Sequence, residues 1–273
     1  MRRRLLFVLL PVLGVVAAGV PIGLRRPSNQ RVWVPEQARM PHVRFVGDSV
    51  YIANVRDFRW RADSSHVAGW EDRSYDLRRL RRAYFVLSPF ARSWQGPAHT
   101  FLSFEFDDGT FLALSVEARR EAGEEYSALR GALRAYELLY VVGEERDLIG
   151  LRAVMWRDPV YVYPVRATPE QVRLLLLRLL ERAQRLETQP EFYNTITSNC
   201  ATNLVDAVNA IAPHRISSSW VLVVPGYSDA LADRLGLLDT KLPLAEARRR
   251  FRVNARARVA ADAPDFSARI RAR

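Results

Sequence analysis

The chain contains a single cysteine, and the position of that cysteine favours a role in chemistry. Cys200 begins a predicted helix over residues 200–211, in which apolar residues recur at helical spacing. A thiol reacts as the thiolate, and the unpaired N–H groups of a helix N-terminus stabilise that anion. Cys200 is therefore a candidate nucleophile, although a lone cysteine also fits a small buried apolar residue.

A hairpin upstream of the cysteine offers a base. Two strand-like runs, 99–106 and 110–117, flank an Asp-Asp-Gly turn. A three-residue turn with Gly109 in the left-handed conformation gives one largely apolar face, whereas a two-residue turn mixes apolar and polar residues. The sequence therefore predicts the first register, in which Leu102 faces Leu114.

The same register places His99 opposite Glu117 on the other face of the hairpin. We therefore predict Cys200 as nucleophile, His99 as general base and then acid, and Glu117 as the residue that orients the imidazole. Ser115, on the same face as Glu117, is the reserve candidate for that orienting role. Backbone N–H groups around Cys200, together with Asn199, are expected to stabilise an oxyanion.

Composition excludes several other classes of function. The formal net charge is +11, and Lys241 is the only lysine, so nearly all positive charge is arginine that is scattered along the chain. No recognised nucleic-acid-binding pattern occurs, and we expect no nucleic-acid partner. The four histidines and one cysteine do not form a ligand spacing, so we expect no metal and no cofactor.

The N-terminus predicts export. Three arginines precede an uncharged apolar run over residues 5–24, which is long enough to span a bilayer or to serve as a cleaved signal peptide. We expect the rest of the chain in the periplasm, as a single-pass inner-membrane protein or, after cleavage, a secreted one. The predicted organisation is listed by residue range: 1–26 signal anchor or signal peptide, 27–42 linker, 43–245 catalytic domain, and 246–273 basic tail, solvated or disordered.

One further helix has a clear start. Thr168 can cap a helix whose first residue is Pro169, and Gln171 completes a capping box. Leucines at helical spacing carry this predicted helix to about Thr188, where its apolar face is expected to pack on the core.

Four segments of the sequence together resemble the Lnb N-terminal periplasmic domain family. They are His99-Thr-Phe-Leu-Ser-Phe-Glu-Phe, Ser115-Val-Glu-Ala-Arg119, the run over residues 140–152, and Phe192-Tyr-Asn-Thr-Ile-Thr-Ser-Asn-Cys-Ala-Thr-Asn203. The resemblance covers roughly residues 45 to 240. It implies an α+β, papain-like cysteine fold with an antiparallel sheet, permuted relative to NlpC/P60-type cell-wall peptidases so that the histidine precedes the cysteine.

The resemblance also implies an activity, lipoprotein intramolecular transacylation, in which an acyl chain moves from a lipid-modified cysteine to the amino terminus of the same lipoprotein. On that basis Cys200 would hold an acyl thioester and His99 would shuttle protons. Tyr193 and Arg119 fall within matching motifs and are candidate substrate-binding residues.

We therefore expect a cysteine-dependent acyl transferase or hydrolase that acts on a lipid or lipoprotein ester at the membrane surface. The alternatives are a cell-wall cysteine peptidase or amidase, and a non-catalytic domain that binds an envelope partner. Lipid chemistry predicts an apolar groove beside Cys200, for which four aromatic residues are candidates: Phe90, Trp94, Trp220 and Tyr227. Peptidase action predicts a polar cleft, and binding alone predicts a buried Cys200 or a histidine out of reach.

Overall fold

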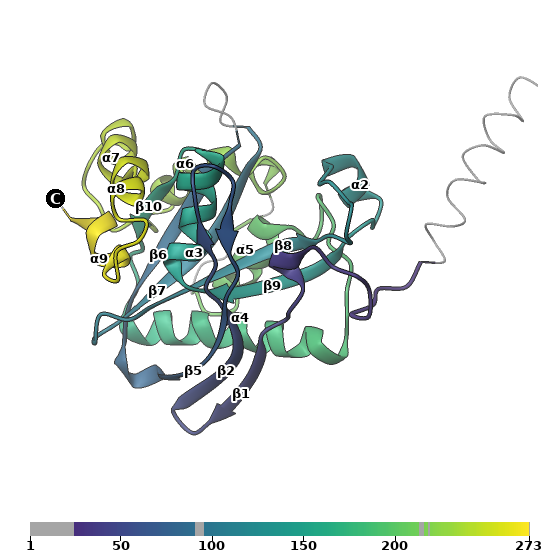
Figure 1. Cartoon of the computed structure of the whole chain (residues 1–273). Coiled ribbons are helices and arrows are strands. Elements are labelled where there is room, and N and C mark those ends of the chain that lie inside the picture. The colour runs from purple at the N-terminus through teal and green to yellow at the C-terminus, as the bar shows by residue number, and fades with distance from the viewer. Residues whose placement is uncertain (1–24, 91–95, 213–215, 218, 273) are drawn as a thin grey trace, which may run out of the picture.

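A large, mainly antiparallel sheet forms the centre of the protein (Figure 1). The computed structural model describes residues 25–90, 96–212, 216–217 and 219–272. The strands are β1 (His42–Val46), β2 (Ser49–Arg56), β3 (Arg59–Trp60), β4 (His66–Val67), β5 (Trp70–Asp76), β6 (Leu80–Pro89), β7 (Ala98–Phe106), β8 (Phe111–Arg119), β9 (Glu137–Gly143) and β10 (Tyr161–Pro164).

Strand order places the predicted histidine hairpin in the middle of this sheet. The order is β1-β2-β9-β8-β7-β6-β10, with β5 paired to β2, while β3 and β4 form a small separate hairpin. Neighbouring strands are antiparallel except β2 and β9, which meet in one parallel pair, Arg56 with Gly143. The fold is therefore α+β with a mostly antiparallel sheet, as the sequence predicted.

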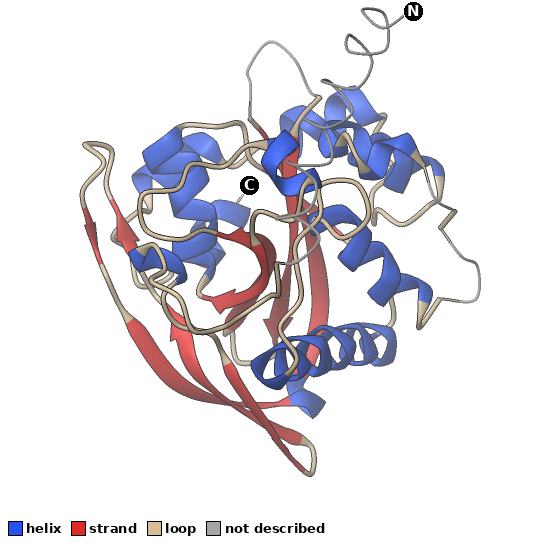
Figure 2. Ribbon diagram, turned by 90° about the vertical axis from the view of Figure 1, so that its right-hand side faces the viewer, coloured by secondary structure: helices blue, strands red, loops and turns tan. Residues whose placement is uncertain are grey.

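Helices cover both faces of the sheet, as the view in Figure 2 shows. The α-helices are α2 (Ala128–Ala132), α3 (Glu145–Gly150), α4 (Pro169–Thr188), α5 (Cys200–Asn209), α6 (Ser228–Arg234), α7 (Leu244–Phe251), α8 (Asn254–Val259) and α9 (Phe266–Arg271). A π-helix, η3 (Leu151–Trp156), continues α3. The short 3-10 helices are η1 (Pro35–Gln37), η2 (Leu77–Arg79), η4 (Trp220–Leu222) and η5 (Pro225–Tyr227).

The two faces have different chemistry. Helices α4 and α5 pack together on one face, where α5 contacts both β7 and β8. Helix α3 covers the other face, where buried Glu145 accepts a hydrogen bond from Ser103 of β7. Because side chains alternate along a strand, His99 lies on the α3 face with Ser103, and Thr100 lies on the α5 face.

The predicted hairpin register is confirmed. Leu102 pairs with Leu114, and the Phe106 N–H bonds the Thr110 carbonyl across the turn at 2.9 Å. Gly109 has a φ of +80°, the left-handed conformation that the three-residue turn requires. Hydrophobic patterning alone was enough to fix this register, because a slip by one residue would expose the apolar face.

Both predicted helix starts are confirmed. Thr168 and Gln171 form the capping box of α4, and Asn199 with Thr202 forms another at α5. Cys200 is therefore the first residue of its helix. The apolar face of α4 packs against β1, β6 and β9, which gives the sheet its core on this side.

Residues 27–42, predicted as a linker, differ from that expectation because they pack on the domain. Gln37 is 4% exposed and Trp33 is 9% exposed. The guanidinium of Arg119 donates to the carbonyls of Gln37 and Ala38 at 3.0 and 2.9 Å and lies over the Trp33 ring. These contacts join residues far apart in the chain, so the local sequence does not indicate them. The linker was predicted from polar composition alone.

The C-terminal residues also pack, whereas charge composition had predicted a solvated or disordered tail. Phe266 and Ile270 are buried against the main core, and Arg271 makes an ion pair with the fully buried Glu145 of α3. Figure 1 shows these helices, in yellow, covering one end of the sheet. These helices contain few apolar residues and many arginines, so the composition did not indicate a buried face. In the structure the apolar residues nevertheless lie on one buried side.

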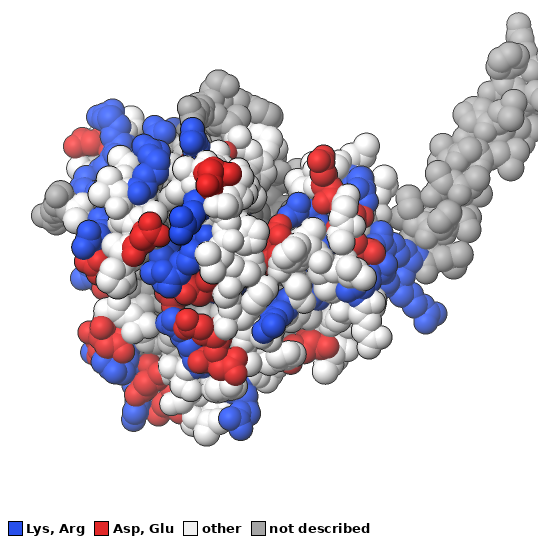
Figure 3. All heavy atoms as spheres, viewed as in Figure 1, with Lys and Arg blue, Asp and Glu red and all other residues white. Residues whose placement is uncertain are grey.

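Figure 3 shows basic and acidic side chains interspersed over the face in view. This distribution agrees with the scattered arginines of the sequence. Among the described residues, no helix combines the length and the apolar character needed to cross a membrane. The apolar run at 5–24, on which the predicted anchor rests, lies outside the described residues.

Candidate active site

The Cys200 thiol lies at the start of α5 against β7. The side chain is 5% exposed, and this burial raises the pKa of the thiol, because a thiolate loses the stabilisation that water provides. The backbone N–H groups of Thr100 and Ala201, together with the charge of Arg152, act in the opposite direction and lower the pKa. Burial outweighs them, so the resting group is a protonated thiol.

Strand β7 connects the surroundings of the thiol with those of the histidine, because Thr100, a neighbour of the thiol, follows His99 in this strand. In an antiparallel pair, the main-chain groups of alternate residues point to the same neighbouring strand. Phe106 bonds across the hairpin, so the N–H of Thr100 also points toward β8. The β7–β8 ladder ends at Phe101, and the Thr100 N–H instead lies close enough to Cys200 to act on the pKa of its thiol. The thiol therefore lies beside the residue that follows His99, where the paired part of the β7–β8 ladder ends.

A serine stands between the histidine and the carboxylate. His99 Nε2 lies 2.7 Å from Ser115 Oγ, and Ser115 Oγ donates to Glu117 Oε1 at 2.9 Å. The single hydroxyl hydrogen is given to the carboxylate, so the serine oxygen accepts from His99. This fixes the tautomer with hydrogen on Nε2, and Nδ1 is left with a free lone pair. The reserve candidate Ser115 thus makes the direct contact, and Glu117 acts through it.

The imidazole is held neutral. Burial, followed by the positive charge of Arg152, lowers the pKa of His99 to about 3, although the charge of Glu117 acts in the opposite direction. At neutral pH the pair is therefore a thiol and an uncharged imidazole. A thiol and a neutral imidazole do not form a standing thiolate–imidazolium ion pair, so attack by this thiol would require proton transfer in the same step.

Glu117 is ionised despite its burial. Burial raises the pKa of Glu117, but the charges of Arg152 and Arg56 outweigh burial and hold it below its usual range. Arg152 Nη2 lies 3.3 Å from Glu117 Oε1, and Gln37 Nε2 donates to Oε2 at 3.1 Å. The Glu117 carboxylate accepts the hydroxyl hydrogen of Ser115. The Ser115 oxygen therefore accepts a hydrogen bond from His99 and does not donate one to it.

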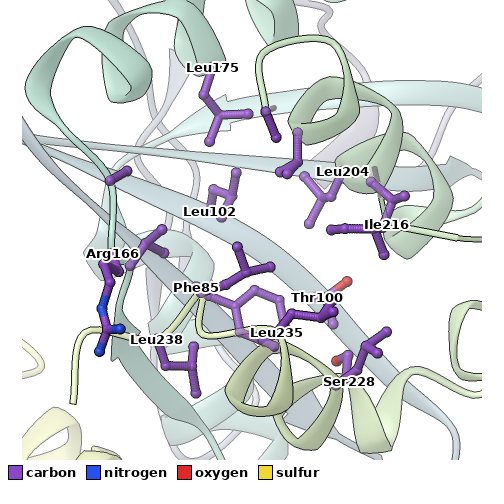
Figure 4. Close-up of a pocket in the computed structure, with 18 of the residues that line it drawn as sticks. Phe85, Thr100, Leu102, Arg166, Leu175, Leu204, Ile216, Ser228, Leu235 and Leu238 are labelled. Atoms are coloured by element: carbon purple, nitrogen blue, oxygen red, sulfur yellow. The ribbon is translucent and has the colours of Figure 1, made fainter. Parts of the chain in front are cut away.

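An apolar groove lies between the sheet and α5, and Figure 4 shows Thr100, Leu102 and Leu204 in its lining. It holds about 1020 Å³ of empty space, open solvent included, and its lining contains Thr100 and Ala201, the two residues that contact the thiol. The walls are aliphatic side chains of the sheet and of α4, α5 and α6, including Leu102, Leu175 and Leu204. Thr100 Oγ1 is buried in this lining and has no hydrogen-bond partner of good geometry among the described residues.

The aromatic residues predicted for this groove do not line it. Phe90, Trp220 and Tyr227 are absent from the described lining, and Trp94 lies outside the described residues. Aliphatic side chains take their place because α5 and α6 present leucine and valine to the sheet. In the described parts of the chain, no group of three or more His, Cys, Asp or Glu residues is arranged to hold a metal ion.

Comparison with known proteins agrees with the motifs. Residues 66–226 match the family model described as the Lnb N-terminal periplasmic domain. The chain belongs to this family. No curated protein and no solved structure gives a match. The matched Lnb domain contains the hairpin, Cys200 and their surroundings, and it is a periplasmic domain.

Two other predicted site residues of the Lnb domain, Asn199 and Arg119, use their side chains in hydrogen bonds that stabilise the fold. Asn199 Oδ1 accepts from the Thr202 N–H, and its Nδ2 donates to the carbonyls of Thr195 and Leu222. Both amide hydrogens are therefore used, and Asn199 caps the helix without offering a free donor to an oxyanion. Arg119 is likewise occupied with the backbone of residues 37–38.

Tyr193 is the predicted substrate residue that does approach the site. Its pKa is raised, first by burial and then by the neighbouring Cys200. Its hydroxyl lies 3.5 Å from that of Tyr126. A neutral phenol beside the thiol can donate a hydrogen bond toward a reacting group, which is the chemistry that a substrate-binding role requires.

Arg152 is the site residue that sequence reasoning missed. The π-helix η3 carries it, and its side chain is 4% exposed between the rings of Phe101 and Trp156. Burial and the charge of Arg56 lower its pKa, while Glu117 raises it. The signal available in the sequence was an arginine inside the apolar run Leu-Ile-Gly-Leu-Arg-Ala-Val-Met, because a charge in such a run needs a buried partner.

Proposed function

We propose that the chain is a periplasmic, papain-like cysteine enzyme that transfers or hydrolyses the acyl group of a lipid or lipoprotein ester. The observation that carries this proposal is the aliphatic groove whose lining includes both Thr100 and Ala201, the neighbours of Cys200. An acyl chain in that groove would bring its ester carbonyl to the thiol. The histidine strand precedes the cysteine helix, which is the order of a permuted papain-like fold.

In the first step the Cys200 sulfur attacks the ester carbonyl carbon while His99 Nδ1 takes the thiol proton. The bare Nδ1 follows from the hydrogen bond of Nε2 to Ser115. The imidazolium then gives its proton to the departing alkoxide, the C–O bond breaks, and an acyl thioester remains on Cys200. Backbone N–H groups of Thr100 and Ala201 supply donors at the reacting sulfur and carbonyl.

In the second step an amine or water attacks the thioester. His99 Nδ1 removes a proton from the attacking group and returns it to the sulfur as the C–S bond breaks. An amine acceptor gives an amide, and water gives a free carboxylic acid.

A peptidase is less well supported, because a peptide substrate calls for polar partners along the cleft. The groove beside Cys200 offers aliphatic carbon over most of its walls. The predicted bilayer span at 5–24 would also hold the domain beside lipid substrates. Binding without catalysis is the alternative that burial of Cys200 and His99 favours, and the following experiment distinguishes it.

The test is intact-protein mass spectrometry after exposure of the full chain to activated acyl esters of different chain length. We expect rapid acylation that is abolished in Cys200→Ala, strongly slowed in His99→Ala, and faster with long acyl chains than with acetyl. His42→Ala is the matched control, since the His42 side chain is 60% exposed and paired with Glu187 away from the site. A folded wild-type protein that stays unmodified would overturn the enzyme proposal in favour of binding.

A further inference from the structure

Exposed apolar side chains cluster around α2. The exposed fractions are 71% for Leu129, 56% for Ile196, 47% for Leu133 and 43% for Tyr126. Leu129 and Leu133 are four residues apart and therefore lie on one side of the helical turn. We call these four residues the α2 patch. Clustered apolar exposure of this kind marks a surface that meets another apolar body.

The α2 patch is held in place by hydrogen bonds between α2 and the loop before Cys200. Thr195 Oγ1 donates to the Ala128 carbonyl at 2.8 Å, and Asn194 Nδ2 donates to the Ala132 carbonyl at 3.1 Å. Asn194 Oδ1 in turn accepts from the Ile196 N–H at 2.9 Å. Ile196 is therefore presented beside α2 by a fixed turn.

The N-terminal segment joins the domain at the same place. Arg25, the first described residue, lies over the Phe192 ring at 5.9 Å and pairs with Glu121 at 3.0 Å. Figure 1 shows this part of the chain reaching the domain beside α2. The preceding residues, 5–24, form the uncharged apolar run that is long enough to cross a bilayer.

The unpaired charges around the α2 patch are two arginines and one carboxylate, since Glu125 beside Tyr126 is exposed and makes no ion pair in the described part of the chain. Arg26 and Arg134 are exposed, and neither makes an ion pair within the part of the chain that the structure describes. Unpaired guanidinium groups beside an apolar patch suit a surface that carries acyl chains and negatively charged phosphates. A lipid bilayer with anionic headgroups has both features.

We propose that the α2 patch docks on the bilayer surface and fixes the orientation of the domain. The loop that carries Ile196 runs directly into α5, so contact with lipid at this loop sets the position of Cys200 relative to the membrane. The inference rests on the predicted bilayer span of residues 5–24, and it does not depend on acyl transfer.

The test uses the full chain with a fluorescent label on an introduced cysteine, in a Cys200→Ala background so that only one thiol is labelled. Leu129→Cys reports on the α2 patch. Val259→Cys is the matched control, because Val259 is 84% exposed on α8, at the opposite end of the molecule in Figure 1. Ile196→Cys provides a second probe should the first variant fold poorly. The proteins are reconstituted in phosphatidylethanolamine–phosphatidylglycerol vesicles with or without brominated acyl chains.

Docking predicts a shift of the label at 129 to shorter emission wavelength, a larger loss of its fluorescence to brominated lipid than at 259, and protection from aqueous iodide. If the protein floats with the vesicles but the labels at 129 and 259 are quenched equally, the α2 patch does not dock. The predicted membrane anchor over residues 5–24 would then remain supported. Protein that does not float would overturn both. Acylation of Cys200, measured separately in the native-cysteine chain, is unaffected by either result, so the two proposals fail independently.

Discussion

Ser115 Oγ accepts the Nε2 hydrogen of His99 at 2.7 Å, while its own hydrogen goes to Glu117. This relationship differs from the direct His99–Glu117 contact that strand register had indicated. The direction of both hydrogen bonds is fixed, because the ionised Glu117 carboxylate can only accept a hydrogen bond. The Ser115 hydroxyl therefore donates to Glu117 and accepts from His99. The orientation of the imidazole therefore depends on Ser115, which the sequence analysis named only as the reserve candidate.

Replacing Ser115 by alanine should slow acylation of Cys200. Loss of the hydrogen bond frees the imidazole to adopt the wrong tautomer, and a loss of about 1.4 kcal/mol corresponds to about a tenfold lower rate. Mass spectrometry of the acyl-enzyme under pseudo-first-order conditions measures this rate. Ser115→Thr keeps the hydroxyl and should recover most of it, whereas equal rates in Ser115→Ala and wild type would contradict this role of Ser115 in orienting the imidazole.

Alkylation of Cys200 by iodoacetamide should rise with pH across the neutral range without a plateau at low pH. Burial raises the pKa of the thiol and lowers that of His99 to about 3, so thiolate accumulates only as pH climbs above the usual range for cysteine. Rates measured from pH 5 to pH 10 check this expectation. A plateau of fast alkylation below neutral pH would reveal a standing ion pair and contradict the neutral one.

Replacing Arg152 by glutamine should raise the pKa of His99 from about 3 toward its ordinary value of 6.5, because a positive charge that disfavours the imidazolium is removed. Titration of the His99 ring signals by NMR measures the shift. Arg157→Gln is the control, since Arg157 is an exposed arginine just beyond η3. No difference between the two variants would show that Arg152 does not act on the imidazole.

A bulky residue in the groove should separate long from short acyl donors. Val205 lines the groove on α5, and Val205→Trp would fill part of the space that an acyl chain needs. We expect acylation by a long-chain ester to fall much more than acylation by an acetyl ester. If both rates fell equally, the substitution would have disturbed the site itself; if neither fell, the groove would not hold the chain.

Arg271→Ala should destabilise the fold, because it leaves the fully buried carboxylate of Glu145 without its cation. Removing one partner of a buried pair costs about 3 kcal/mol. Urea denaturation measures the free energy of unfolding. The exposed pair of Arg269 with Asp265 provides the comparison, where Arg269→Ala should cost no more than about 0.5 kcal/mol. Similar losses in both variants would contradict a structural role for the C-terminal helix.

The sequence by itself determined the local structure of the site. The Asp-Asp-Gly turn and the alternation of apolar residues specified the hairpin register, and the capping residues specified where α4 and α5 begin. These features depend on residues a few positions apart, or on one face of a single hairpin, so pattern and turn chemistry are sufficient. The functional pairing of His99 with Cys200, which lie about a hundred residues apart in the chain, was predicted from their residue types, and the family motifs include both residues.

Only the tertiary structure decided what each polar group does. Asn199 and Arg119 were plausible site residues from the sequence, but in the structure their side-chain N–H groups donate to carbonyls of residues distant in the chain. Arg152 had no assigned role in the sequence analysis, and the structure shows that η3 brings it to Glu117. Burial and pairing of a polar side chain depend on which elements meet, and that information is spread over the whole chain.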